Sequence, residues 1–400
     1  MRHTSRAERP DTWRGLETCV AGIAPLALPQ VPAEGLPEEK VRTVMAHKAT
    51  PAPRIRQESH APVPRGDGFR QEPSLQRAIH RGNLAALDLG TNNCRLLIAR
   101  PNGERFVIVD AFSRIVRLGE GLSATGRLSD AAIDRTLSAL WVCAEKLRRR
   151  RVVLARSVAT EACRQAENGQ DFVDRVYRET GIMLDIISPR EEARLAVLGC
   201  QMLLEPGDGP ALIFDIGGGS TELVLLDGEG DRLRIVDWLS APHGVVSLAE
   251  AVAGHRDDPE GRATAYAEMK GKMCEAFASF AARLPRGGPA RLLGTSGTVT
   301  TLASVYLGLP RYDRQAIDGL IVPARSMREI AERLSLMSID ERIAQPCIGT
   351  ERADLVVAGC AILESILDIW PADRLGVADR GIREGILRSL MDRASSRLLG

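Results

Sequence analysis

Two carboxylates with glycine, serine and threonine between them are the first residues in this sequence whose types and spacing suit chemistry. Asp215 ends one apolar run and Glu222 begins another, and residues 216–221 read Ile-Gly-Gly-Gly-Ser-Thr. A glycine turn exposes backbone N–H groups that bind phosphate oxygens. Carboxylates beside a phosphate repel it unless a divalent cation lies between them, and hard cations take oxygen ligands. The stretch therefore predicts a site for phosphate plus metal, although a plain hairpin has the same pattern.

An earlier stretch repeats this pattern. Residues 84–99 again read as apolar strand, polar turn and apolar strand, and Asp88 and Arg95 fall on Asp215 and Glu222 when the stretches are aligned 127 residues apart. We interpret the match as a duplication that gives two similar domains. Arg95 in place of a carboxylate makes the hairpins unequal. We expect the first to clamp phosphate and the second to bind the metal.

A third turn has the same composition. Residues 291–303 read as a strand, a turn of glycine, serine and threonine, and the start of a helix. Backbone amides at a helix N-terminus bind anions, which makes Gly294, Ser296 and Gly297 candidate phosphate contacts. Ordinary helix capping would give a similar sequence.

A glutamate without a structural task lies between the two hairpins in the sequence. Ser188 is expected to cap a helix, with Pro189 at its first position and Glu191 at its third, the arrangement of a capping box. Glu192 is left over and projects from the first helical turn. Its alternative interpretation is a solvent-exposed helix residue.

These candidates need elements that bring them together. Residues 1–82 hold 10 of the 22 prolines and no sustained hydrophobic period, which predicts a disordered tail. Residues 83–204 and 205–400 are expected to form two domains joined by the linker at 205–210, with the last helix either in the second domain or packed back on the first. Hydrophobic periodicity predicts helices after Ser129, over 161–180, from 188, within 246–284 and over 324–336, 339–344 and 352–369, and further strands at 106–112, 152–158, 184–187, 233–239 and 375–378.

Composition excludes several classes of protein and site. Apolar residues make up 44% and charged residues 26% of the 400, and a net charge of +1 gives no global field for nucleic acid or a membrane surface. No apolar run approaches the ~20 residues that span a bilayer. The eight cysteines contain no Cys-x-x-Cys pair, which predicts reduced thiols in a cytoplasmic protein and no zinc site.

Several other catalytic motifs are missing from the sequence. Only His243 and His255 occur after residue 82, so a histidine-metal hydrolase site is not expected. Lys272 lacks the preceding glycine loop of a Walker motif, and the glycines at 217–219 precede a strand where a dinucleotide fingerprint opens a helix. Phosphate chemistry by carboxylates, a metal and backbone amides remains.

Two Asp-x-Gly hairpins in repeated halves resemble the actin/Hsp70/sugar-kinase superfamily, which implies an α/β fold of two ribonuclease H-like domains with a cleft between them. Four stretches further resemble the Ppx/GppA family of exopolyphosphatases and guanosine pentaphosphate phosphohydrolases. They are Val158-Ala-Thr-Glu-Ala-Cys-Arg-Gln-Ala166, Ile187-Ser-Pro-Arg-Glu-Glu-Ala-Arg194, Asp215-Ile-Gly-Gly-Gly-Ser-Thr-Glu222 and Asp379-Arg-Gly-Ile-Arg-Glu-Gly385. The resemblance spans residues 83–395 and specifies the family more closely than the substrate.

This resemblance implies release of orthophosphate from the end of inorganic polyphosphate. Guanosine penta- or tetraphosphate is the alternative substrate, and a polyphosphate- or alarmone-binding sensor or a sugar or acetate kinase are further alternatives. The resemblance makes Glu192 the general base, and Asp88, Asp215 and Glu222 the ligands of Mg²⁺ or another divalent cation. It also implies that the protein is a homodimer. The expected phosphate contacts are Thr91, Asn92, Asn93, Arg95, Arg164, Gly217, Gly218, Gly219, Ser220, Thr221, Gly294, Ser296 and Gly297.

Overall fold

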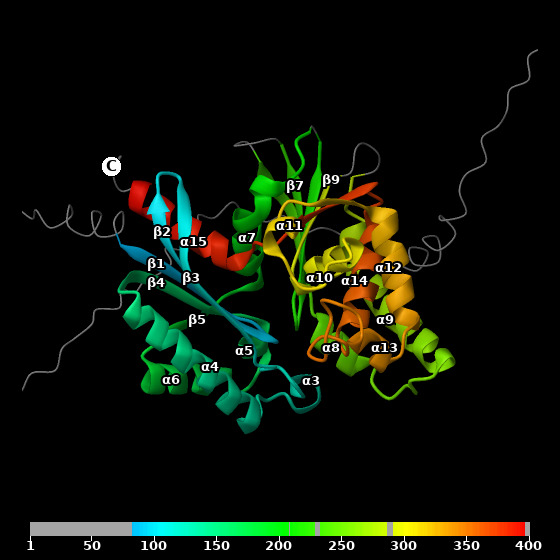
Figure 1. Cartoon of the computed structure of the whole chain (residues 1–400), viewed down its shortest axis with the longest axis horizontal. Helices are drawn as coiled ribbons and strands as arrows, with labels where there is room; N and C mark the ends of the chain where they lie inside the picture. The colour runs from blue at the N-terminus through cyan, green and yellow to red at the C-terminus, as the bar shows by residue number, and fades with distance from the viewer. Residues whose placement is uncertain (1–81, 208, 229–232, 286–290, 397–400) are drawn as a thin grey trace, which may run out of the picture.

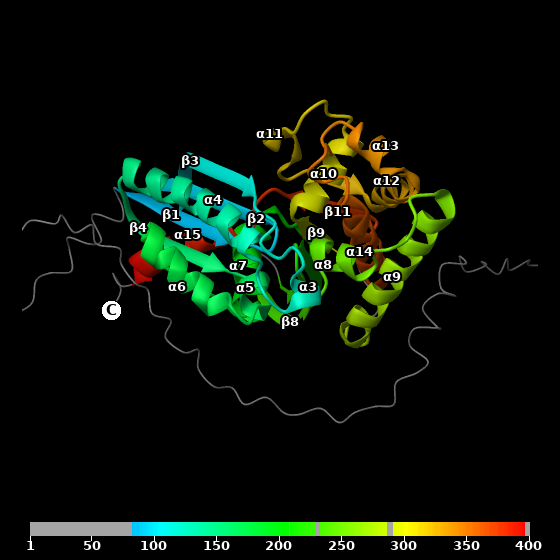
Figure 2. The ribbon, with the colours of Figure 1, turned by 90° about the horizontal axis from the view of Figure 1, so that it is seen from below.

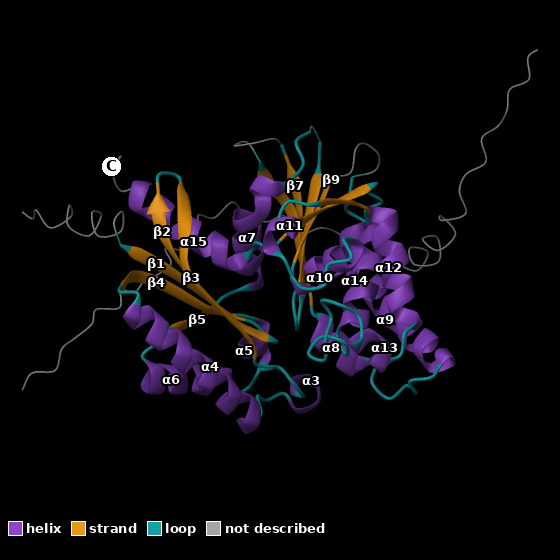
Figure 3. Ribbon diagram, viewed as in Figure 1, coloured by secondary structure: helices purple, strands orange, loops and turns teal. Residues whose placement is uncertain are grey.

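The computed structural model describes residues 82–207, 209–228, 233–285 and 291–396, so the tail predicted at 1–82 lies, apart from Gly82, outside the described residues. Two β-sheets stand apart in the molecule, each covered by helices (Figures 1 and 3). The α/β fold with mixed sheets that the sequence predicts is confirmed.

The first sheet has its strands in the order β3-β2-β1-β4-β5. Its residues alternate between two faces, as strand geometry requires: in β1, Ala85 and Leu87 pack with helices α4 and α6, whereas Leu84 and Ala86 pack on the opposite side. Figure 2 shows α4 and α6 along one face. The elements are β1 (Asn83–Leu89), β2 (Asn93–Asn102), β3 (Arg105–Ile115), α3 (Leu122–Thr125), α4 (Asp130–Arg149), β4 (Val152–Ala159), α5 (Glu161–Gln165), α6 (Gly169–Thr180) and β5 (Leu184–Ile186).

The second sheet has the order β10-β11-β9-β6-β7-β8. Helices α9, α10, α12 and α14 cover one face and form the largest core of the chain, and α7 covers the other. The elements are α7 (Pro189–Cys200), the 3₁₀ turn η2 (Gln201–Leu203), β6 (Ala211–Ile216), β7 (Thr221–Asp227), β8 (Arg234–Ala241), α8 (Val245–Ala251), α9 (Pro259–Ala281), β9 (Arg291–Thr295), α10 (Gly297–Tyr306), α11 (Arg314–Ile317), β10 (Ile321–Pro323), α12 (Ala324–Leu336), α13 (Ile339–Ile343), α14 (Val356–Ile369), β11 (Arg374–Ala378) and α15 (Ile382–Ser396).

The predicted repeat is present in the strand register. Asp88 pairs across the ladder with Arg95, and Asp215 pairs with Glu222, so the aligned residues occupy equivalent places in two antiparallel hairpins. Each hairpin is followed by a parallel partner strand, β4 beside β1 and β9 beside β6. The two turns close with equivalent 2.9 Å hydrogen bonds, from Gly90 N to Asn93 O and from Gly217 N to Ser220 O.

Helices α7 and α15 lie between the two sheets (Figure 1). Ala193 and Val197 of α7 pack on the second sheet, whereas Leu195 packs with α15 on the first. The last helix of the chain thus packs against the first sheet, and the helix that ends the first half of the chain packs against the second. Gly199 makes the approach possible, because a Cβ there would collide with the carbonyl of Gly381 and lie 3.0 Å from Gly385 N.

One predicted helix is interrupted in the structure. The helix expected over 161–180 is two helices, because the chain turns at Asn168, whose amide side chain bonds both backbone groups of Leu128, and at Gly169, where a Cβ would collide with the carbonyl of Cys163. The helices expected within 246–284 are α8 and α9, and α9 begins with Pro259 after the cap Asp258.

Two of the compositional predictions can be compared with the described residues. None of the helices they form is long and apolar enough to cross a membrane. Six cysteines carry free thiols, namely Cys94, Cys143, Cys163, Cys200, Cys347 and Cys360.

Gly385→Ala is expected to destabilise the protein, because its methyl group would collide with the carbonyl of Leu195 and separate α15 from α7. Overpacking costs about 1–3 kcal/mol, which exceeds the ~1 kcal/mol that alanine gains over glycine in a helix. Urea denaturation measures the free energy of unfolding. Gly271→Ala in α9 is the matched control, because nothing lies within 4 Å of the added methyl group. Equal stability of the two variants would contradict this packing.

Candidate active site

The predicted site residues come together in one cavity between the two sheets. The tips of both hairpins, the turn between β9 and α10, and the N-terminal ends of α5 and α7 all contribute to its lining. Fourteen of the predicted residues line it: Asp88, Thr91, Asn92, Asn93, Arg95, Glu192, Asp215, Gly217, Gly218, Gly219, Ser220, Glu222, Ser296 and Gly297.

The two hairpin tips approach each other closely. A Cβ on Gly218 would lie 3.0 Å from Thr91 Cβ and 3.1 Å from Asn92 N, and a Cβ on Gly219 would lie 2.6 Å from the Thr91 hydroxyl. Glycine is therefore needed at both positions for contact between the tips. In the described part of the chain, the amides of Thr91, Asn92, Gly218 and Gly219 donate to no protein acceptor, so they remain able to bind an anion.

Asp88, Glu192, Asp215 and Glu222 are four of the carboxylates that line this cavity, and burial raises the pKa of each of these four. The pKa of Asp215 rises to about 6, and that of Glu222 rises to about 7 because of burial and then repulsion by Asp215. Burial also raises the pKa of Asp88, which Arg95 opposes. The pKa of Glu192 is raised well above its ordinary value by burial and then by Glu222. The cavity thus concentrates negative charge that a cation would relieve.

Glu192 lies in the first turn of α7, and the residue is 6% exposed. Ser188 caps this helix by accepting a hydrogen bond of 3.2 Å from the amide of Glu191, as predicted. The Glu191 carboxylate does not complete the expected capping box. It binds Arg156 and Arg194, at 2.9 Å and 2.7 Å, and so is held away from the cavity. The helix separates the two neighbouring glutamates as the sequence predicts, one for structure and one in the site.

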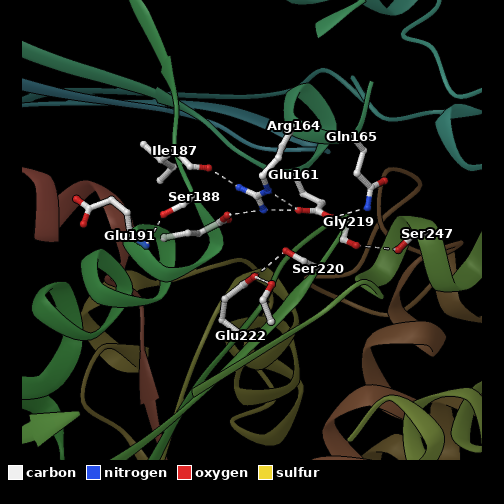
Figure 4. A network of polar contacts seen from close by, with 12 residues as sticks. Glu161, Arg164, Gln165, Ile187, Ser188, Glu191, Gly219, Ser220, Glu222 and Ser247 are labelled. Carbon is white, nitrogen blue, oxygen red and sulfur yellow. Dashed lines mark hydrogen bonds and ion pairs between the residues drawn. The ribbon is translucent and has the colours of Figure 1, made fainter. Parts of the chain in front are cut away.

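Arg164 is not part of the lining. Its guanidinium donates to the carbonyl of Ile187 at 2.6 Å and to both Glu161 and Glu192, the latter at 3.1 Å (Figure 4). The arginine therefore contacts the predicted base, and it is not among the residues that line the cavity.

Two other predicted phosphate contacts also lie behind the cavity. Thr221 is fully buried, and its hydroxyl donates to the carbonyl of His243 at 2.7 Å. Gly294 lies in β9, where a Cβ would collide with the ring of Phe214. Core packing accounts for both residues.

The third turn faces the cavity through its helix end. Ser296 caps α10, a ten-residue helix, and has a positive φ of 128° that is unusual for a serine. The Arg95 guanidinium reaches toward this turn, at 3.8 Å from the position of a Cβ on Gly297. The cation of the first hairpin thus spans the cavity to the second half of the chain.

Several lining residues were not singled out from the sequence. Glu161 and Thr160 lie inside the stretch 158–166, in which only Arg164 was predicted to have a role in the site. Thr298 and Thr301 follow the third turn on α10, and helical spacing of four residues from Gly297 could have indicated Thr301. Arg352 donates to the Thr301 hydroxyl at 2.7 Å, and nothing in its local sequence signals this position.

The carboxylates suit a divalent cation but do not form a closed ligand cage. Among the described residues, no three His, Cys, Asp or Glu side chains converge as a ready metal cluster. Asp88 nevertheless has a buried Oδ1 without a hydrogen-bond partner, and such an atom needs a cation or water. Mg²⁺ typically takes one or two carboxylates, waters and substrate phosphates, and the donors Asp88, Asp215 and Glu222 fit that pattern.

Glu222→Gln tests the repulsion inside the cavity. The folded-state pKa of about 7 lies above the ordinary 4.5, so the stability gained from protonation is present below pH ~4.5 and lost as pH rises through ~7. Glutamine cannot ionise and can still accept from Ser220 and Ser240. In EDTA we expect the variant to exceed wild type by about 1–3 kcal/mol at pH 8 and by much less at pH 5. Urea denaturation at both pH values measures the free energy of unfolding of the two proteins. If their difference in stability is the same at pH 5 and pH 8, the prediction is contradicted.

Comparison with known proteins agrees with this geometry. Residues 97–394 match the model of the Ppx/GppA phosphatase family. The chain is 33% identical over 322 residues to exopolyphosphatase 2 of Mycobacterium tuberculosis, covering 77% of this chain and 98% of that protein. The crystal structure of the Aquifex aeolicus Ppx/GppA family member superimposes with a TM-score of 0.64 at 29% identity over 78% of this chain and 98% of that one. An exopolyphosphatase structure from Cytophaga hutchinsonii gives a TM-score of 0.70 at 25% identity over 78% and 98%. The chain therefore belongs to the Ppx/GppA phosphatase family.

Proposed function

We propose that this protein is an exopolyphosphatase, which hydrolyses the terminal phosphoanhydride of inorganic polyphosphate and releases orthophosphate. The observation that carries the proposal is the position of Glu192. Helix α7 brings this carboxylate into a cavity that both glycine-rich hairpin tips also line, so an acceptor for a proton lies beside donors for phosphate.

The chain supplies binding groups for the end of a polyanion. The free amides at the two tips and the Arg95 guanidinium would bind the terminal phosphate, which gains charge-assisted hydrogen bonds. The amide end of α10 at Ser296 and Gly297 adds positive potential from the second half of the chain. Positioning and electrostatic stabilisation supply most of the acceleration in phosphoryl transfer.

Glu192 would accept a proton from the attacking water. Its raised pKa makes it a better base than an exposed glutamate. The acid limb of activity should therefore lie above the ordinary pKa of a glutamate. Arg164 holds the carboxylate from one side and leaves its other oxygen for the water.

Asp88, Asp215 and Glu222 would hold Mg²⁺, directly or through water. When bound, the ion would neutralise phosphate charge as the bridging oxygen leaves. The carboxylates themselves repel a phosphate chain, so substrate binding is expected to depend on a divalent cation.

Guanosine pentaphosphate is the second candidate substrate. Ile115, Leu355 and Val356 give the cavity an apolar wall, which a nucleoside could contact and a bare phosphate chain could not. The same phosphate contacts and the same base would serve both substrates. A binding sensor without turnover would require that neither is hydrolysed.

Glu192→Gln is expected to lower kcat about 10²–10⁴-fold, because the water loses its base. Phosphate release from long-chain polyphosphate and from guanosine pentaphosphate, each with Mg²⁺, measures this. Glu191→Gln is the matched control: it changes the adjacent residue in the same way, and its ion pairs with Arg156 and Arg194 lie outside the cavity. It should retain activity within a few-fold. Full activity of a folded Glu192→Gln would show that Glu192 is not the base. If wild type hydrolyses guanosine pentaphosphate and not polyphosphate, the nucleotide replaces polyphosphate as the proposed substrate.

Mg²⁺ is expected to raise the melting temperature of wild type at pH 8, because a ligand at 100 times its dissociation constant stabilises the folded state by ~2.7 kcal/mol. Asp215→Asn should lose most of this increase. Asp227→Asn is the control, since that carboxylate pairs with Arg234 at the surface of the same sheet. Thermal melts with Mg²⁺ and with EDTA test the assignment without reference to turnover, and an equal increase in Asp215→Asn would refute it.

A further inference from the structure

Glu161 is a cavity-lining carboxylate to which the proposed reaction gives no role. It lies at the first position of α5 with 9% of its surface exposed. Its Oε2 accepts from Arg164 Nε at 2.9 Å and from Arg164 Nη2, and its Oε1 accepts from the side-chain amide of Gln165. Both carboxylate oxygens are therefore engaged within its own short helix.

The same guanidinium reaches Glu192. Arg164 Nη1 donates to the carbonyl of Ile187 at 2.6 Å, and Nη2 donates to Glu192 Oε2 at 3.1 Å while also contacting Glu161. A guanidinium is planar with donors in fixed directions. Two anchors of the guanidinium, the Glu161 carboxylate and the Ile187 carbonyl (Figure 4), therefore fix where the third contact falls.

We propose, on the basis of the hydrolytic function above, that Glu161 is a positioning residue: by holding Arg164 in this orientation, it limits the arginine to one hydrogen bond with Glu192 and keeps the second oxygen of the base free for water. Glu161 also packs against the second hairpin, because a Cβ on Gly219 would lie 3.1 Å from its Cγ. The residue therefore links the support of the base to the turn that is expected to bind phosphate.

The chemical consequence follows from what Arg164 would do alone. Without Glu161, Nε and Nη2 are both available to Glu192, and a bidentate pair would occupy both carboxylate oxygens. Loss of a neighbouring negative charge and a stronger pairing with arginine both lower the pKa of Glu192. The other charged groups facing it, Asp88 of β1 and Glu222 of β7, act in the opposite direction and are unchanged by the substitution.

The test compares Glu161→Ala, Glu161→Gln and wild type in phosphate release from polyphosphate and from guanosine pentaphosphate across pH 5–9. We expect Glu161→Ala to lower kcat about tenfold or more with little change in KM, and to move the acid limb of the pH profile down by about half a pH unit or more. Glu161→Gln should be intermediate, because its amide oxygen still accepts from Arg164. Glu167→Ala is the control, since this nearby carboxylate pairs with Arg127 at the surface.

Three outcomes would overturn the assignment of Glu161. Unchanged kcat in Glu161→Ala removes its effect on the base, and reduced kcat with an unmoved pH profile indicates a structural role alone. If wild type hydrolyses neither substrate, the proposed function fails, and Glu161 is tested by carbon-13 NMR titration of the Glu192 carboxyl, assigned with Glu192→Gln. An equal pKa of Glu192 in wild type and Glu161→Ala then overturns the positioning role, whereas a lower pKa in the variant supports it.

Discussion

The contact between α7 and α15 is the constraint on which the rest of the structure depends. Two glycines, Gly199 and Gly385, let the two backbones approach closely. At each of these positions, a carbonyl oxygen of the other helix or of its N-terminal turn lies where a Cβ atom would be. The helix pair lies between the sheets and packs against apolar residues of both. Because α7 packs on two sides, the position of its N-terminal turn is fixed, and Glu192 in that turn is held at the cavity.

The cavity is an electrostatically unfavourable place for carboxylates, and this cost points to a function. Burial removes water from Asp88, Glu192, Asp215 and Glu222, and the charges of Asp88, Asp215 and Glu222 each raise the pKa of at least one other member of this group. A core under selection for stability alone would replace such a cluster with apolar residues. The cost is consistent with a site that receives a cation together with a polyanion, since charges that repel in the free protein are then compensated.

The equivalent register of the two hairpins explains why they can differ without losing their geometry. Backbone register sets the positions of Asp88 and Asp215, and it places their ladder partners, Arg95 and Glu222, at equivalent points. The register is insensitive to which side chain occupies the second position. One half could therefore keep a carboxylate and the other acquire a guanidinium that reaches across the cavity.

Prediction from the sequence was most successful where the signal is local. The apolar strand β1, the cap at Ser188 and the two glycine-rich turns depend on neighbouring residues, and each could be predicted from the sequence. The break at Asn168 was missed because the side-chain amide finds its partner at Leu128, 40 residues away. Arg352 and the contacts of Arg164 were missed for the same reason, since a long cationic side chain has many partners within reach and local sequence does not choose among them.

By itself, then, the sequence determined the repeat, the α/β class, the family resemblance and the separation of Glu191 from Glu192, because strand periodicity, turn composition and capping are short-range properties. The tertiary structure decided which residues share the cavity. It placed Thr221 and Gly294 in the core. It also placed the Arg164 guanidinium in contact with Glu192, the predicted base, and brought Glu161 into contact with the same guanidinium. Those outcomes depend on the packing of helices against two sheets, where burial and close backbone approach act between residues far apart in the chain.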